Sequence, residues 1–153
     1  MSDTPALLDL RLESLPHEVI RHRPVSSLEE AAEARGVTPS QVIKTMVVRR
    51  GANDYVFVLV PGDRVIAWPK LRSHLGVNRL SMPDAAEAER VTGYRRGTIT
   101  PLGATTAWPV VADQAIEGTV SIGGGDHGVS LTVAGSDLIE ALGADVADIT
   151  DPV

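Results

Sequence analysis

The sequence predicts a single α+β domain whose mixed, mostly antiparallel sheet is curved and barrel-like and is flanked by helices. A chain of 153 residues with 43% hydrophobic side chains is long enough to bury one sizeable core. Two β-branched, apolar stretches, residues 41–50 and 55–60, are separated by turn-forming residues. Other stretches carry helix-start and helix-stop residues, such as Ser26 or Ser27 before and Gly36 after one of them. We therefore expect one domain over residues 1–153.

In the first half of the chain, leucines at positions 7, 8, 12 and 15 recur at helical spacing and predict a helix over residues 5–14. Pro16 ends this helix, and a short strand is expected over residues 17–22. After the helix that Gly36 closes, a new helical turn begins at Thr38 with Pro39 at its first position. Three strands, at residues 41–50, 55–60 and 64–67, are expected to form an antiparallel meander.

In the second half, helices are expected where caps and apolar spacing coincide. The first covers residues 69–75 and is closed by Gly76; the second starts at Ser81 or Pro83 and ends near Gly93; the last covers residues 137–142 and is capped by Ser136. Strands are predicted at residues 77–80 and 107–112, together with a hairpin of 118–122 and 129–134. The acidic end, residues 145–153, is expected to be a loose tail.

Composition excludes several classes of function. The chain has no cysteine, which removes disulfides and thiol chemistry, and its histidines lack metal-ligand spacing, so no metal or cofactor is expected. Because residues 1–5 do not resemble a signal peptide and no apolar run reaches bilayer length, we expect a cytoplasmic protein with no membrane partner.

Charge is distributed unevenly along the chain. All 14 Lys and Arg lie at or before Arg96, giving 14 − 12 = +2 there, whereas residues 97–153 carry eight acidic side chains and no basic ones. An acidic protein of this kind is a poor general binder of DNA or other nucleic acid. A local basic face could still receive the end of a polyanion, and a solvated surface fits the same counts.

A glycine-rich stretch over residues 92–103 is the first candidate site. It contains Gly93, Gly97, Gly103 and Pro101, next to the basic pair of Arg95 and Arg96. Glycine permits close approach to the main chain, and exposed amide groups in such a loop can hold an anion or a developing oxyanion. The alternative is a bent connection between two strands.

Two further features could belong to the same pocket. Lys44 lies in an otherwise apolar predicted strand, where it either extends to water or opens into a pocket to hold a phosphate, carboxylate or carbonyl group. A second glycine cluster over residues 123–128 contains His127, which is either a proton carrier or a solvated loop residue. The sequence contains neither a Gly-x-Ser-x-Gly elbow nor a phosphate-binding P-loop.

The order of these motifs resembles one family. Gly-Val-x-x-x-Gln-Val-Ile precedes Lys44, a Gly-Asp turn follows, and then come Thr-Gly-Tyr-x-x-Gly-x-x-x-Pro-x-Gly and the late glycine cluster. This arrangement, over about residues 25–138, is similar to the YbaK/prolyl-tRNA-synthetase-associated domain family, the freestanding relatives of a synthetase editing domain. The resemblance implies the fold of that family and the hydrolysis of mischarged aminoacyl-tRNA in trans.

The resemblance also implies roles for individual residues. The enzyme would be a carboxylic ester hydrolase that removes a small amino acid, with a proline tRNA as one candidate carrier, by positioned water and backbone oxyanion stabilisation. Its partners would be the tRNA acceptor end and, in one version, a synthetase. The implied catalytic residues are Lys44, Gly97, Pro101 and Gly103; the implied substrate-binding residues are Thr98, Thr100, Arg95, Arg96, Gly123, Gly124, Gly125 and His127.

One position departs from the family pattern. Ser130 stands where the cysteine-specific branch carries an acidic residue, so the resemblance leaves the amino acid open. Two other functions remain open as well: a non-catalytic module that binds an aminoacyl-tRNA end or a synthetase, and an inert domain with the family fold. Lys44 and the intact glycine and proline pattern favour the enzyme.

Overall fold

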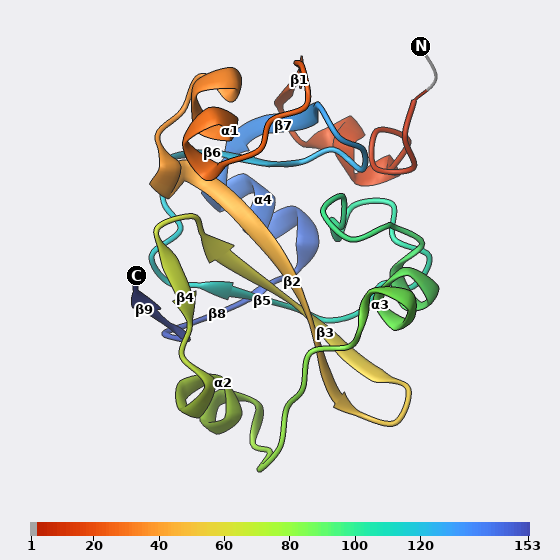
Figure 1. Ribbon diagram of the computed structural model, residues 1–153, viewed down its shortest axis with the longest axis vertical. Coiled ribbons are helices and arrows are strands. Elements are labelled where there is room, and N and C mark those ends of the chain that lie inside the picture. The colour runs from red at the N-terminus through yellow and green to blue at the C-terminus, as the bar shows by residue number, and fades with distance from the viewer. Residues whose placement is uncertain (1–2) are drawn as a thin grey trace.

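The computed structural model describes residues 3–153 as one α+β domain built on a seven-stranded sheet (Figure 1). The strands lie in the order β1-β7-β6-β2-β3-β5-β8, and a second sheet pairs β4 with β9. Their bounds are β1 His17–Arg21, β2 Val42–Gly51, β3 Asp54–Pro61, β4 Arg64–Ile66, β5 Val110–Asp113, β6 Thr119–Gly123, β7 Val129–Ala134, β8 Asp145–Ala147 and β9 Thr150–Pro152.

The sheet is mixed, as predicted. Strands β1 and β7, β7 and β6, and β2 and β3 pair antiparallel, whereas β6 pairs with β2, β3 with β5, and β5 with β8 in parallel. The predicted hairpins β2–β3 and β6–β7 are confirmed, because both depend on local turns. The third predicted strand is present as β4, but its predicted pairing is wrong: β4 pairs with β9 and not with β3.

The prediction of a loose C-terminal tail is also wrong. Strand β8 extends the main sheet beside β5, and β9 pairs with β4. Between them Ile149 is fully buried, and its N–H donates to the carboxylate of Asp113 at 3.1 Å. One buried apolar side chain and two short pairings therefore fix a segment whose acidic composition suggested a solvated tail.

The helices are α1 Leu28–Arg35, α2 Trp68–Leu75, α3 Ala85–Thr92 and α4 Gly135–Leu142, with 3-10 turns η1 Leu10–Ser14 and η2 Pro39–Gln41. Ser27 caps α1 through a bond from the N–H of Glu30, and Gly36 ends it with a φ of 73°. The cap of α3 is Asp84, and Ser136 caps nothing. The sequence placed both helix starts incorrectly because neighbouring Ser, Asp and Pro residues offer similar starts.

Three other predicted elements are shorter than expected or do not form. The predicted helix over residues 5–14 is a turn followed by η1, and the strand predicted from residue 107 begins at Val110. No strand forms over residues 77–80 of the described chain, where the nearest pairing is a single bridge between Arg49 and Ser81.

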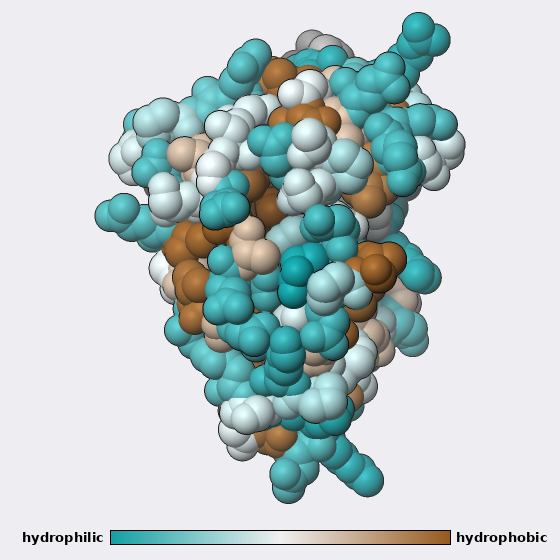
Figure 2. Space-filling model, turned by 90° about the vertical axis from the view of Figure 1, so that its left-hand side faces the viewer, coloured by the Kyte–Doolittle hydropathy of each residue, from teal (hydrophilic) through white to brown (hydrophobic). Residues whose placement is uncertain are grey.

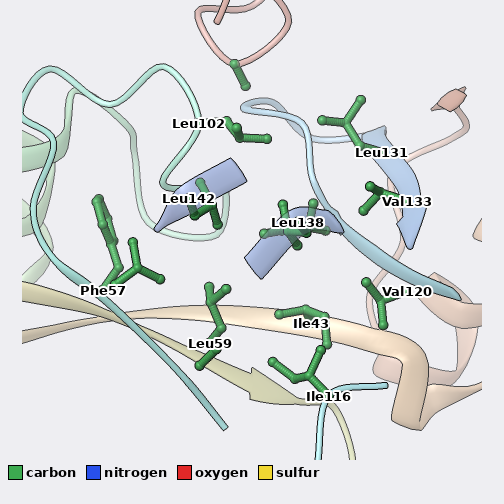
Figure 3. Close-up of a cluster of buried hydrophobic side chains, with 14 of the residues drawn as sticks. Ile43, Phe57, Leu59, Leu102, Ile116, Val120, Leu131, Val133, Leu138 and Leu142 are labelled. Carbon is green, nitrogen blue, oxygen red and sulfur yellow. The ribbon is translucent and has the colours of Figure 1, made fainter. Parts of the chain in front are cut away.

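Two apolar layers cover the two faces of the sheet. On the inner face the sheet curves around α4, whose Leu138 and Leu142 contact side chains from several strands (Figures 1 and 3). On the outer face a smaller cluster lies beneath α2. Figure 2 views the side of α1, β4 and α2, where polar side chains predominate and small apolar patches show between them. Within residues 3–153, no helix has the length and apolar character needed to cross a bilayer.

Candidate active site

A pocket forms where β2 and β6 separate. Strand β6 pairs with β2 only at the first two residues of β2. Farther along, the backbone of Arg49 exchanges bonds of 2.8 and 3.1 Å with Ser81, so these groups point away from β3. Because backbone direction alternates along a strand, the N–H and C=O groups of Thr45 and Val47 point to the same side. Strand β2 therefore presents a stretch of free edge between the two contacts.

The cavity beside this edge has a volume of about 710 Å³, within the usual range for small-ligand sites. Its wall is made by six separate parts of the chain. They are residues 42–47 of β2, residues 96–99 of the first glycine loop, residues 123 and 125–129 of the second, residues 82–85 and 88 at the start of α3, and His22, Pro24, Val25 and Arg35. Among residues 3–153, no group of three or more His, Asp or Glu side chains is placed to hold a metal ion.

Lys44 lies on the wall of this cavity. Its side chain is half-buried, and its Nζ donates to the carbonyl oxygen of Arg64 at 2.7 Å. Burial lowers the pKa of Lys44, and the negative charge of Asp63 opposes that shift. An ammonium group has three donors, so the bond to Arg64 leaves two for a ligand. Lys44 does not extend into bulk water, which favours the pocket interpretation of this residue.

The first glycine loop lines the cavity with its first half, residues 97–99. Gly97 has a φ of 89°, and a Cβ there would lie 3.4 Å from the imidazole of His127. Thr98 is fixed by bonds from its N–H and hydroxyl to the carbonyl of Arg95, at 2.9 and 2.7 Å. In the described chain, the N–H groups of Gly97 and Ile99 have no protein acceptor. These two amides are available to an oxyanion.

The second half of the loop, residues 100–103, does not line the cavity. Thr100 and Pro101 are buried, and the carbonyl of Pro101 accepts a bond of 3.3 Å from Arg11. The N–H of Gly103 donates to the carboxylate of Asp9 at 2.8 Å, and a Cβ on Gly103 would lie 2.3 Å from the backbone of Pro5. This half of the loop is held against the N-terminal segment, residues 3–15.

Asp9 and Arg11, which the sequence did not single out, thus position the loop. Asp9 accepts bonds from the backbone N–H of Arg11 at 2.9 Å and from its guanidinium at 2.7 Å. The guanidinium of Arg11 lowers the pKa of Asp9 to about 2, with further lowering by the N–H of Gly103. A short Asp-x-Arg turn was the available signal, but its partner loop lies about 90 residues away.

The second glycine loop also meets the N-terminal segment. The hydroxyl of Thr4 donates to the carbonyl of Gly124, and a Cβ on Gly125 would lie within 3.2 Å of Thr4 and Ala6. Gly123 and Gly125 line the cavity, whereas Gly124 does not. His127 is exposed and lies on the cavity wall next to Gly97. The N-terminal segment, residues 3–15, therefore contacts and supports both glycine loops.

The basic pair is divided between wall and surface. Arg95 and Arg96 are both exposed, and only Arg96 lines the cavity. The start of α3, which also lines the cavity, is fixed by a bond from the hydroxyl of Tyr55 to Glu87. The ring of Tyr55 lies edge-on to Trp108, whose indole donates to the carbonyl of Val91 at 2.8 Å. Rigid contacts thus hold the wall on which Asp84 and Ala85 lie.

The chain is similar to known proteins. It is 35% identical over 91 residues to the proline–tRNA ligase of Trichlorobacter lovleyi, covering 60% of this chain and 16% of that ligase. It is 25% identical over 126 residues to EbsC of Enterococcus faecalis, named as a candidate Cys-tRNA(Pro)/Cys-tRNA(Cys) deacylase, covering 81% and 77% of the two chains. The crystal structure of a candidate trans-editing enzyme for prolyl-tRNA synthetase shares the fold, with a TM-score of 0.85 over 99% of both chains and 22% identity.

The match to a protein family covers every residue that lines the cavity. The sequence model of the aminoacyl-tRNA editing domain matches residues 22–141. That range contains β2 with Lys44, both glycine loops and the strands that carry them. This confirms the resemblance indicated by the order of the sequence motifs. The chain therefore belongs to the aminoacyl-tRNA editing domain family.

Proposed function

We propose that this protein hydrolyses, in trans, the ester bond of a tRNA charged with the wrong amino acid. The observation that carries the proposal is the convergence of Lys44, the free amides of Gly97 and Ile99 and the second glycine loop on one cavity of about 710 Å³. Family membership and the likeness to EbsC support the same reaction class. A small amino acid and a proline tRNA are the first substrates to test.

The pocket supports direct attack by water. An aminoacyl ester is already activated, so the protein needs to position water and to stabilise the oxyanion that forms at the ester carbonyl. The N–H groups of Gly97 and Ile99 can donate to this oxyanion, and so can those of Thr45 and Val47 on the free edge of β2. Preorganised amides of this kind typically contribute about 10²- to 10³-fold in rate per donor.

Lys44 supplies the positive charge in this scheme. With one donor held by the carbonyl of Arg64, its remaining two N–H groups can bind a phosphate or the ester oxygen of the terminal nucleotide. Partial burial makes such a charge–anion contact stronger than it would be at the surface. The free ribose hydroxyl beside the ester provides a route for the proton, because it can hydrogen bond to both the water and the leaving oxygen.

The decisive experiment is incubation with a panel of mischarged tRNAs, led by small amino acids on proline tRNA. Release of free amino acid that falls at least 10²-fold in Lys44→Ala, and remains in Lys70→Ala, supports the enzyme. Lys70 is a matched control because it is the other lysine of the chain and pairs with Asp148 outside the cavity. Binding of the panel without turnover would instead identify a binding module.

The same assay tests the route of the proton. A tRNA whose terminal ribose hydroxyl beside the ester is replaced by hydrogen should react much more slowly. An unchanged rate with that substrate would contradict the role of the hydroxyl while leaving the hydrolase assignment in place.

A further inference from the structure

A polar patch lies on the outer face of the sheet, next to Lys44. Residues that pair across neighbouring strands point to the same face of a sheet. Because Val42 pairs with Ser121 and Ser121 pairs with Thr132, the hydroxyls of Ser121 and Thr132 lie on the same face as the side chain of Val42. Ser130 lies two residues before Thr132 and shares that side, and Lys44 lies two residues after Val42. Hydroxyls from two strands and the ammonium of a third therefore lie on one face.

Arg35 joins this patch from the last turn of α1. Its Nη1 donates to the hydroxyl of Ser121 at 3.4 Å, while its Nε is buried and has no partner. None of the ion pairs formed by residues 3–153 involves Arg35. Burial lowers the pKa of Arg35, yet a guanidinium remains charged in proteins. A half-buried cation thus faces neutral hydroxyls and no carboxylate.

Other polar groups in the patch are buried without partners. They are the hydroxyls of Ser130 and Thr132 and the Nε2 atom of His22. The Nδ1 atom of His22 lies 2.7 Å from the carbonyl of Arg23. Because a carbonyl only accepts, Nδ1 carries the proton and Nε2 is an acceptor in the neutral ring. Buried polar atoms without partners destabilise a protein unless something else completes their bonds.

The patch borders the cavity at Gly123, while Ser121 and Ser130 are fully buried and do not line it. Gly123 pairs with Ser130, and a Cβ added there would meet no atom within 4 Å. Arg35, His22, Gly123 and Lys44 all line the same cavity. The acidic side chains on that wall, Asp84 and Asp126, are both exposed.

We propose that Arg35, which lines the cavity and donates to the buried hydroxyl of Ser121, forms an anion subsite that binds an oxyanion of the ligand. This inference rests on the proposed function for the identity of that ligand, an aminoacyl-tRNA end. Arg35 is then a substrate-binding residue, because its planar fork matches a phosphate or a carboxylate. Either the terminal phosphodiester or an acidic amino-acid side chain would supply that group.

The test is an NMR titration of the full chain with sodium phosphate and, separately, with sodium succinate, at constant ionic strength. The arginine Nε–Hε resonances report on hydrogen bonding of the guanidinium directly. We expect the Arg35 signal to shift with at least one oxyanion and to stay in place with chloride. Phosphate as the stronger ligand assigns the subsite to the phosphodiester, and succinate assigns it to an acidic side chain; both support the proposal.

Two variants sharpen the titration. Arg35→Gln should weaken oxyanion binding about tenfold or more, whereas Arg79→Gln should not change it. Arg79 is a suitable control because it is exposed and lies outside the cavity. An Arg35 signal that stays in place throughout both titrations of the unmodified protein would overturn the proposal, whatever the variants do.

The failure of this inference is distinguishable from failure of the proposed function. If the tRNA panel is hydrolysed while the Arg35 signal does not respond, the enzyme assignment stands and the subsite is wrong. If the signal responds and no tRNA of the panel is hydrolysed, the anion subsite stands and the hydrolase is wrong.

Discussion

The two halves of the first glycine loop differ in what their glycines contact. Gly97 lies on the cavity wall, where the nearest atom to an added Cβ would be the His127 ring at 3.4 Å. Gly103, six residues later, does not line the cavity, and a Cβ added there would lie 2.3 Å from the backbone of Pro5. Both have a positive φ, of 89° and 68°. One glycine thus leaves space for a ligand, and the other leaves space for the protein's own N-terminal segment.

The largest expected effect follows from this contrast. Gly103→Ala should lower the free energy of unfolding by about 3 kcal/mol or more, since a clash with backbone atoms adds to the strain of a positive φ. Gly97→Ala should cost only about 1 kcal/mol, from strain, and yet slow ester hydrolysis by about tenfold or more, because it adds a methyl group at the cavity wall and strains the backbone that carries a proposed oxyanion donor. Thermal unfolding and the tRNA panel measure the two quantities separately.

Gly143→Ala is the control for strain alone. Gly143 has a φ of 61°, and a Cβ there would meet no atom within 4 Å. It should therefore match the stability loss of Gly97→Ala and leave hydrolysis unchanged. Equal stability losses for Gly103→Ala and Gly143→Ala would contradict the packing role of Gly103.

Sequence alone predicted the parts of this arrangement that depend on neighbours along the chain. The hairpins β2–β3 and β6–β7 and the stop of α1 at Gly36 follow from turn residues and caps. The position of Lys44 in a pocket rested on a charge within an apolar strand. By contrast, strands β8 and β9 have three residues each, too few for a pattern, and their partners lie far away in the chain.

Only part of the cavity lining could be predicted from the sequence. Seven of the residues singled out from the sequence line the cavity: Lys44, Arg96, Gly97, Thr98, Gly123, Gly125 and His127. The other five do not: Arg95, Thr100, Pro101, Gly103 and Gly124. A glycine pattern shows where the backbone must bend or be approached, but not whether a ligand or another segment approaches it. Arg35 was missed because its neighbours depend on the register of β6 and β7.

A second prediction concerns the ion pair behind the packed half of the loop. The pKa of Asp9 is lowered from 3.8 to about 2, so the charged carboxylate contributes about 2 kcal/mol of stability at neutral pH. Because the folded pKa is the lower one, this contribution is complete above pH 3.8 and disappears as the pH falls through about 2. Asp9→Asn should therefore be less stable near pH 7 and should approach the unmodified protein in acid.

Urea unfolding at several pH values measures this difference. Glu33→Gln is the control, since Glu33 is exposed and forms none of the ion pairs found in residues 3–153. A constant gap between Asp9→Asn and the unmodified protein from pH 7 to pH 2 would contradict a charge effect at Asp9. It would point instead to lost hydrogen-bond geometry at Gly103.

The smallest expected effect on stability is at the exposed side of the loop. Arg95 and Arg96 form no ion pair within the described chain, so replacing both with Ala should change the free energy of unfolding by less than about 0.5 kcal/mol. Binding of tRNA should nevertheless weaken, and the slope of log affinity against log salt should flatten by about 1 to 2. Each arginine that releases counterions from a phosphate contributes to that slope. Filter binding at several salt concentrations separates a phosphate contact, which changes the slope, from a surface charge, which leaves both slope and affinity unchanged.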